Sequence, residues 1–198
     1  HMTNVKSLRE YIKEAEEKGY PFQSETSDTE VIVALLATSP EKDFLEALRK
    51  VLPRLKGAFA LTVLFKDKVI GVRDGFGIRP LCLGRDATSW ILASEECAFH
   101  TIRADFIREI QPGEIIVLGK NGIEDNFTWA DNPRLKLCIF EYIYFARPDS
   151  RLAGKRVNSY REEAGETVPK EHSVQADIVC GVPISGEIYD SAVAGILG

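Results

Sequence analysis

The sequence contains few cysteines and no long apolar run, and both absences exclude classes of protein. Its 198 residues hold four cysteines, Cys82, Cys97, Cys138 and Cys180, and no C-x-x-C pair. This spacing fits neither a zinc knuckle nor a disulfide framework and is typical of a reducing cytosol. No apolar stretch approaches the ~20 residues that span a bilayer, and the Glu/Lys-rich segment from Leu8 onward is no signal peptide. We therefore expect a cytoplasmic protein without a membrane partner, with Cys82, Cys97 and Cys180 as buried free thiols.

Positive charge is also scarce. The sequence has 25 Lys and Arg against 30 Asp and Glu, which gives a net charge of -5 with His neutral. This balance argues against a nucleic-acid partner held by phosphate contacts. A composition of 44% hydrophobic and 28% charged residues indicates a folded globular chain, long enough for one ordinary domain and part of a second.

Motifs for self-contained catalysis are missing as well. The sequence has no G-x-S-x-G, no G-x-x-x-x-G-K-[ST] and no carboxylate pair at catalytic spacing. Nucleophilic catalysis needs a Cys, Ser or Thr beside a base. His100 and His172 lie in ordinary amphipathic sequence without such a neighbour. The residues alone therefore predict an α/β protein without an evident complete active site.

The first quarter of the sequence predicts three helices. The first spans Leu8–Lys18, and the second spans Thr29–Ala37 behind a capping box formed by Ser27 and Glu30. The third begins with Ser39 as its N-cap, followed by proline at the first helical position.

From Gly57 the pattern changes to strands. Ala58–Phe65 and Val69–Arg73 form the first predicted hairpin, and the near-continuous apolar run of the former predicts a strand covered on both faces. The clearest hairpin joins Glu114–Leu118 to Ile123–Phe127 through Asn121-Gly122, a type I′ signal. Helices followed by antiparallel strands predict an α+β fold with helices stacked on a pair of sheets.

An aromatic segment, Cys138–Ser150 (CIFEYIYFARPDS), separates this region from the rest. Aromatic residues at this density bury a large area, so we expect partner surfaces on more than one side and interpret the segment as a seam between two domains. Beyond it, Asn158–Glu171 predicts a helix broken by Pro169, and Asp177–Val182 predicts a buried parallel strand. A single such strand lacks the neighbouring strands that a parallel sheet needs. We therefore expect this chain to be a part of a larger structural unit.

Four stretches carry a family resemblance: Gly57–Gly84, Ile91–Phe99, Ile107–Leu118 and the aromatic segment Cys138–Ser150. Together they resemble amidophosphoribosyltransferase, the glutamine-dependent first enzyme of de novo purine synthesis. The R-D-G-F-G-I-R-P-L portion is shared with other class II glutamine amidotransferases, including asparagine synthetase, whereas FEYIYFARPDS is much more specific to the purine enzyme.

The resemblance implies a fold and a reaction. Residues 3–137 would be the C-terminal part of a class II glutamine amidotransferase domain with the four-layer αββα N-terminal-nucleophile fold. Residues 138–198 would be a linker and the first strand-helix of a type I phosphoribosyltransferase domain. The family converts glutamine and phosphoribosyl pyrophosphate to phosphoribosylamine, glutamate and pyrophosphate. Its nucleophilic N-terminal cysteine and Asn-Gly oxyanion hole have no match here, so we expect no catalytic residue and no activity of this chain alone.

The resemblance assigns three candidate site residues. Asp28 matches the aspartate that binds the glutamine α-amino group, and the alternative is a helix first-turn acid favoured by the dipole. Ser185 matches a hydroxyl for magnesium-phosphoribosyl pyrophosphate, although Ile184 stands where the family has aspartate, and the alternative is a helix N-cap. Cys138 matches a [4Fe-4S] ligand of one family branch, but with one possible ligand of four we expect no cluster.

Two other functions remain open. One is a non-catalytic binding or assembly module derived from this family, and the other is a different class II glutamine amidotransferase. Open sheet edges would favour a homo-oligomer. The expected small-molecule partners are glutamine and phosphoribosyl pyrophosphate.

Overall fold

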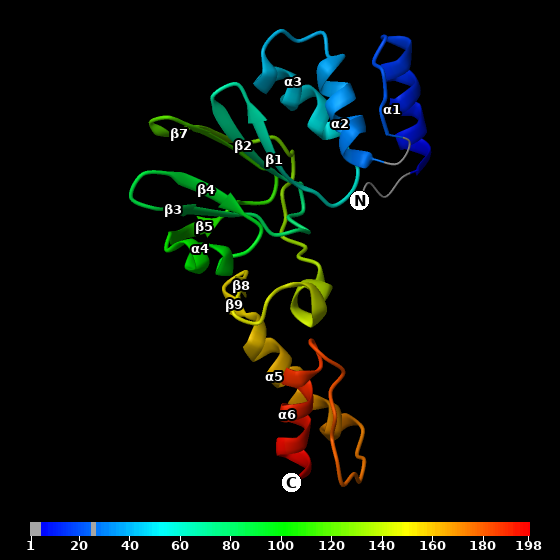
Figure 1. Ribbon diagram of the computed structural model, residues 1–198. Helices are drawn as coiled ribbons and strands as arrows, with labels where there is room; N and C mark the ends of the chain where they lie inside the picture. Colours follow the sequence, from blue (N-terminus) through cyan, green and yellow to red (C-terminus); the bar gives the residue numbers. More distant parts are fainter. Residues whose placement is uncertain (1–4, 25–26) are drawn as a thin grey trace. The chain divides into compact units, whose positions relative to one another are not determined.

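The computed structural model describes residues 5–24 and 27–198, which fall into two units (Figure 1). The first contains the described residues up to Arg79 together with Gln111–Lys136, and the second contains Pro80–Ile110 and Leu137–Gly198. The domain assignment to residues 3–137 and 138–198 comes from the family resemblance and remains a prediction. Among the described residues, no helix combines the length and apolarity that a membrane span requires.

Three helices open the first unit, as the sequence predicts: α1 (Val5–Glu17), α2 (Asp28–Ala37) and α3 (Phe44–Val51), which continues as a short 3-10 helix (Leu52–Arg54). At α2 the Ser27 hydroxyl accepts a hydrogen bond from the Glu30 amide at 3.3 Å. The Glu30 carboxylate does not complete the predicted capping box, because it accepts the amides of Gln23 and Ser24 at 2.7 and 2.8 Å.

The predicted start of the third helix is wrong. Asp43, not Ser39, is the N-cap: one carboxylate oxygen accepts the amides of Leu45 and Glu46, both at 3.0 Å. Ser39 accepts only a long contact of 3.4 Å from the Glu41 amide. A cap acts where the apolar face begins, and that face begins at Phe44.

A four-stranded antiparallel sheet follows in the order β1-β2-β6-β7, with β1 (Ala60–Phe65), β2 (Lys68–Arg73), β6 (Glu114–Gly119) and β7 (Gly122–Thr128). The prediction that the first strand is covered on both faces is wrong, because β1 is an edge strand and Leu64 is 77% exposed. The central strand β6 is instead buried along all but its last residue. The apolar run in the sequence therefore did not show whether the strand lies at the edge or at the centre of the sheet.

The helices pack on this sheet through one apolar core, visible in Figure 1 as the α1–α3 layer beside β1 and β2. Val31 and Leu35 of α2 and Leu48 of α3 meet Ile70 of β2 and Ile115 of β6 in a single cluster of buried side chains. Helical and strand periodicities each direct one apolar face to this cluster, which is why the sequence specifies these elements well.

The β6–β7 hairpin does not have the predicted turn. Gly119 pairs with Gly122, so the loop is Lys120-Asn121, and of these residues only Gly122 has a positive φ, of 113°. A type I′ turn needs positive φ at both central residues.

The second unit contains a three-stranded antiparallel sheet in the order β4-β3-β5, formed by β3 (Cys82–Arg85), β4 (Trp90–Ala93) and β5 (Asp105–Glu109), with helix α4 (Cys97–Ile102) between β4 and β5 in sequence. Gly84 of β3 lies directly under the Phe99 ring of α4, where a Cβ atom would come within 2.5 Å of the ring. Cys82 and Cys97 are buried, as predicted.

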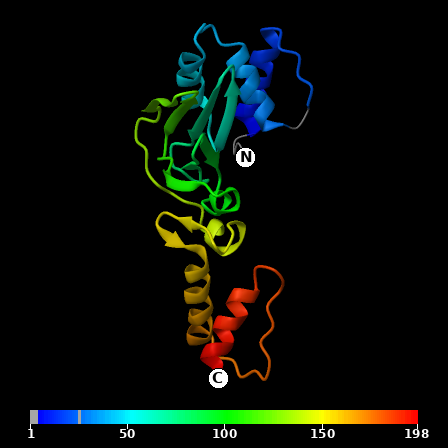
Figure 2. The same ribbon diagram turned by 60° about the vertical axis from the view of Figure 1, so that its left-hand side comes forward.

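The remainder of this unit comprises a π-helix (η2, Glu141–Phe145), a small hairpin of β8 (Arg151–Leu152) and β9 (Lys155–Arg156), and helices α5 (Val157–Glu171) and α6 (Glu187–Leu197). Helix α5 continues through Pro169 without the predicted break. Figure 2 shows α5 and α6 side by side, and Gly165 permits this approach because a Cβ there would lie 2.7 Å from that of Ala192.

The predicted buried strand Asp177–Val182 is absent. Its residues form no strand, and Ile178 and Val182 are 83% and 78% exposed. Cys180 is exposed too, so the prediction of a buried thiol there is wrong. A parallel strand exists only with hydrogen-bonded neighbours, and the described residues offer none beside this segment.

The aromatic segment is anchored by several elements of its unit. The Ser150 hydroxyl and the Arg147 amide donate to the Glu95 carboxylate at 2.7 and 2.8 Å, and the Tyr189 hydroxyl of α6 donates to the Ile143 carbonyl at 3.2 Å. The buried Arg161 donates hydrogen bonds from Nε to the Tyr142 carbonyl at 2.7 Å and from Nη2 to the Ala146 carbonyl at 2.8 Å. Phe140 and Tyr144 nevertheless remain more than half exposed. Described residues of this unit therefore contact the segment from several elements but leave part of its aromatic surface exposed, and the role of the segment as a domain seam remains a prediction.

The two possible caps of α3 give a direct stability test. We expect Asp43→Ala to lower the free energy of unfolding of the first unit by about 1 kcal/mol, because two helix amides lose their acceptor. Ser39→Ala, the matched control, should change it by less than about 0.5 kcal/mol. Urea unfolding followed by Trp129 fluorescence in a Trp90→Phe background measures both. Equal effects of the two substitutions would contradict the assigned cap.

A second test uses pH. The Arg54 guanidinium, followed by the Lys18 ammonium, lowers the pKa of Glu14 from 4.5 to about 2. Because the folded pKa is depressed, this stabilisation is fully present above the ordinary pKa and is lost as pH falls through about 2. We expect Glu14→Gln to cost about 1 kcal/mol at neutral pH and progressively less in acid, measured by urea unfolding.

Glu17 is the control for this experiment. Its side chain is 67% exposed and its Oε1 atom lies 3.9 Å from the Lys13 ammonium, so Glu17→Gln should have little effect at any pH. A cost of Glu14→Gln that stays constant from neutral pH to about pH 2 would overturn the assignment to the Arg54 ion pair.

Candidate functional site

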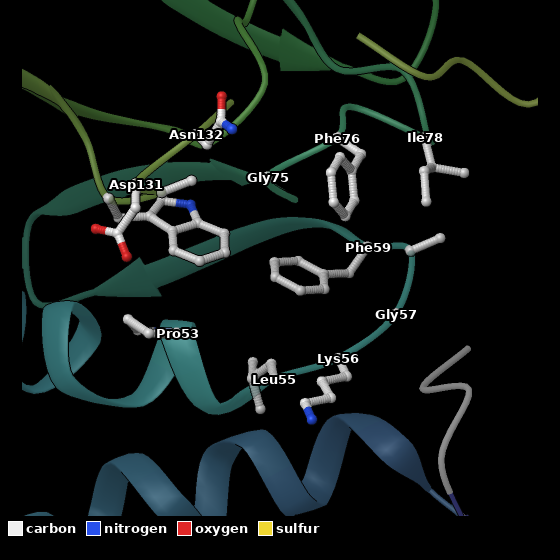
Figure 3. Close-up of a pocket in the computed structure, with 13 residues that line it drawn as sticks. Pro53, Leu55, Lys56, Gly57, Phe59, Gly75, Phe76, Ile78, Asp131 and Asn132 are labelled. Atoms are coloured by element: carbon white, nitrogen blue, oxygen red, sulfur yellow. The ribbon is translucent and has the colours of Figure 1, made fainter. Parts of the chain in front are cut away.

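A cavity of about 770 Å³ lies within the first unit. Three stretches line it: residues 53–59 after α3, residues 75–78 after β2, and residues 129–132 after β7. Figure 3 shows the side chains of Phe59 and Phe76 facing the same space from two of these stretches. The rings of Phe59 and Trp129 stack with centroids 6.1 Å apart and planes 16° from parallel. The pocket therefore has an aromatic wall built from elements far apart in sequence.

Two charged residues that are almost completely buried, Arg73 and Asp74, fix the loop on one side of this pocket. The two oxygens of the Asp74 carboxylate accept hydrogen bonds from the amides of Phe76 at 2.9 Å and Ile78 at 3.0 Å. The Arg73 guanidinium donates to the Gly77 carbonyl at 2.9 Å. Buried charges must be compensated, and here loop backbone supplies much of the compensation.

The close packing around Arg73 explains why the loop has glycine at position 77. Gly77 has φ +56°, and a Cβ there would lie 3.0 Å from the Pro112 side chain and 3.1 Å from the Arg73 guanidinium. The Trp129 indole N–H also donates to the Arg73 carbonyl at 3.1 Å. The R-D-G-F-G stretch thus holds the loop and the aromatic wall in one arrangement.

The lining of the pocket suits binding rather than covalent chemistry. Lys56, Asp131 and Asn132 supply polar groups, while no Cys, Ser, Thr or His is among the residues that line it. A mostly apolar pocket with a few polar groups is the usual form of a small-molecule site. This pocket was not predicted from the sequence, although the R-D-G-F-G stretch was visible as a motif.

The internal thiols have the wrong environment for a nucleophile. Burial raises the pKa of the Cys97 thiol, which keeps it protonated at neutral pH. Its sulfur lies 3.8 Å from the Glu95 carboxylate, whose negative charge acts in the same direction. The buried Cys82 contacts the Ser94 carbonyl at 3.9 Å. Neither thiol is therefore arranged for nucleophilic attack.

Asp28 is the first residue of α2 and is half-buried behind the Ser27 cap. It does not line the pocket described above. A first-turn acid is favourable at a helix N-terminus, so this position agrees with both interpretations of the residue. Its role toward glutamine remains a prediction.

Ser185 lies half-buried in the turn before α6. Gly186 occupies the N-cap position of that helix and no side chain caps it, so the alternative of Ser185 as a helix N-cap is wrong. The Asp190 carboxylate accepts the Gly181 amide at 2.7 Å and so ties the preceding loop to α6. A magnesium or phosphoribosyl pyrophosphate role for Ser185 remains a prediction.

Cys138 lies half-buried just before η2, and its carbonyl accepts the Glu141 amide at 3.0 Å. Among residues 5–24 and 27–198, no three His, Cys, Asp or Glu side chains gather in a way that could hold a metal ion. The structure gives Cys138 a backbone role at the start of the aromatic segment.

Comparison with known proteins gives consistent matches. The family model of the glutamine amidotransferase domain matches residues 2–101. An amidophosphoribosyltransferase of Methanocaldococcus jannaschii is 40% identical over 205 residues, which cover 96% of this chain and 43% of that protein. The Staphylococcus epidermidis amidophosphoribosyltransferase is 41% identical over 199 residues, covering all of this chain and 39% of the relative.

Solved structures agree with these relatives. Glutamine phosphoribosylpyrophosphate amidotransferase from B. subtilis, complexed with ADP and GMP, superimposes with a TM-score of 0.90 at 33% identity. The match covers 98% of this chain and 42% of that one, so the chain spans about two fifths of the length of these relatives. The domain model, the identity and the fold together show that the chain belongs to the glutamine amidotransferase family and is a homologue of the amidophosphoribosyltransferases.

Proposed function

We propose that this chain is part of an amidophosphoribosyltransferase that transfers ammonia from glutamine to phosphoribosyl pyrophosphate. The observation that carries the proposal is the 40% identity to the M. jannaschii enzyme across 96% of the chain. In this proposal residues 3–137 belong to the glutaminase domain and residues 138–198 lead into the transferase domain. A cytoplasmic location, magnesium at the transferase site and a homo-oligomeric assembly are further parts of it.

Asp28 is the proposed contact for the α-ammonium group of glutamine. A carboxylate meets an ammonium through a charge-assisted hydrogen bond, which is stronger than a neutral one. Its half-buried place in the first turn of α2 supports the role, because partial burial limits screening by water. Ser27 holds the same turn through its bond to the Glu30 amide at 3.3 Å, so the position of Asp28 is fixed by local structure.

The residues of this chain would bind and position glutamine without attacking it. Amide hydrolysis needs an activated nucleophile and donors for the oxyanion. The buried Cys97 is protonated at neutral pH because its pKa is raised, and the lining of the large pocket has no nucleophilic thiol or hydroxyl. We therefore assign this chain the framework and substrate-binding part of the reaction.

A ligand pair tests the role of Asp28. Glutaramate is glutamine without its α-amino group, so only glutamine offers the ammonium that Asp28 would bind. We expect glutamine to bind more tightly than glutaramate by about tenfold in an NMR titration of the ¹⁵N-labelled chain. Asp28→Asn should remove this difference, and the exposed control Glu41→Gln should retain it. A preference for glutamine that survives Asp28→Asn would refute the assignment.

A further inference from the structure

A second pocket, of about 340 Å³, lies within the second unit. It is separate from every candidate residue discussed above, since neither Cys138 nor Ser185 lines it. Its volume is at the lower end of the roughly 300–1,000 Å³ typical of small-molecule sites. Charged side chains of both signs line it, together with the Phe106 ring.

Two arginines of this pocket stand directly opposite each other. Arg151 of β8 pairs in register with Arg156 of β9, and both line the pocket. Like charges in directly opposite positions of an antiparallel pair are destabilising. In the described part of the chain, neither guanidinium takes part in a hydrogen bond or an ion pair. Both remain available to an anionic group.

The hairpin is held in place despite this repulsion. Ala153 and Gly154 have φ values of 47° and 79°, which places a type I′ turn here rather than at the predicted Asn121-Gly122. Leu152 is completely buried, and its carbonyl accepts a hydrogen bond from the Tyr142 hydroxyl. The two arginines are thus held side by side by contacts that do not involve their charged ends.

The acidic residues of the pocket differ in how they are engaged. Asp149 forms two hydrogen bonds of 3.0 Å with the Arg147 guanidinium, and Glu109 accepts the Ala153 amide at 2.6 Å. Glu96 is different: its Oε2 atom is buried and has no hydrogen-bond partner. The Glu96 side chain also lines the pocket, so its negative charge can pair with a cationic group placed there.

Together these groups determine the chemistry of the ligand. A simple anion would meet the arginines but face the unsatisfied Glu96 carboxylate, and a simple cation would face the arginines. A zwitterion satisfies both, with its carboxylate at Arg151 and Arg156 and its ammonium group at Glu96. Phe106, which is 38% exposed, offers an apolar wall for a side chain. We propose that this pocket binds a free α-amino acid with an apolar side chain.

L-Leucine and two analogues test the proposal by isothermal titration calorimetry on the whole chain. 4-Methylpentanoate lacks the ammonium group of leucine, and 3-methylbutylamine lacks its carboxylate. We expect leucine to bind in the millimolar range or more tightly, and each analogue about tenfold more weakly. Failure of leucine to bind at concentrations on the order of tens of millimolar, or equal binding of either analogue, would overturn the proposal.

Substitutions locate the site. Glu96→Gln and the double change Arg151→Gln with Arg156→Gln should each weaken leucine binding about tenfold. Glu171→Gln and Arg103→Gln are controls at positions outside the pocket lining and should leave affinity unchanged. Unchanged affinity in the pocket variants would contradict the site.

A stability measurement separates binding from folding. Because the double arginine change removes like-charge repulsion, thermal stability without ligand should be maintained or rise while the affinity for leucine falls. A loss of both would assign the arginines to the fold. Failure of the Asp28 experiment would leave this site untouched, because the residues of the two sites do not overlap.

Discussion

The buried Arg73 and Asp74 are the constraint on which the first unit depends. Their side chains lie at the end of β2 and bind the backbone of the loop that follows, so the loop is held from inside the molecule. The Asp74 carbonyl also accepts the Gly113 amide at 2.8 Å, which ties the loop to the start of β6. Trp129 adds a third attachment through the Arg73 carbonyl. Loss of either side chain would leave buried backbone groups without their hydrogen-bond partners, at a cost of about 1–3 kcal/mol for each group.

This arrangement gives the charged motif a structural meaning. Buried charged residues near a pocket are often candidates for catalysis. Here Arg73 and Asp74 direct hydrogen bonds to backbone, while Phe59, Phe76 and Trp129 face the cavity. The charges shape the pocket, and the aromatic rings define what it can hold.

Sequence reasoning succeeded where the local signal and the tertiary contacts agree. The three helices and the strands of the first unit follow directly from apolar periodicity, since each presents one face to the same core. It failed where several local signals compete. Ser39 and Asp43 are both acceptable caps, and only packing at Phe44 selects the second. Asp177–Val182 has the composition of a strand, but pairing partners rather than composition make a strand.

The candidate sites also differ in how far the sequence could predict them. Asp28 was found only through family resemblance, because a first-turn acid is common in helices generally. The small pocket could not have been predicted, since its hairpin has strands of two residues each and leaves no alternation in the sequence. The pairing of Arg151 with Arg156 becomes visible only once the type I′ turn at Ala153 fixes the register.

The central claim is that these residues provide the framework of the proposed glutamine-using enzyme, while the buried thiols of Cys82 and Cys97 do not attack the substrate. Ammonia release from glutamine, followed across the elution profile of the purified chain, tests this most directly. We expect no release above that of buffer in any fraction, because the Cys97 thiol is protonated and the large pocket has no nucleophile. Release that follows the protein peak and disappears on Cys97→Ser would contradict the account.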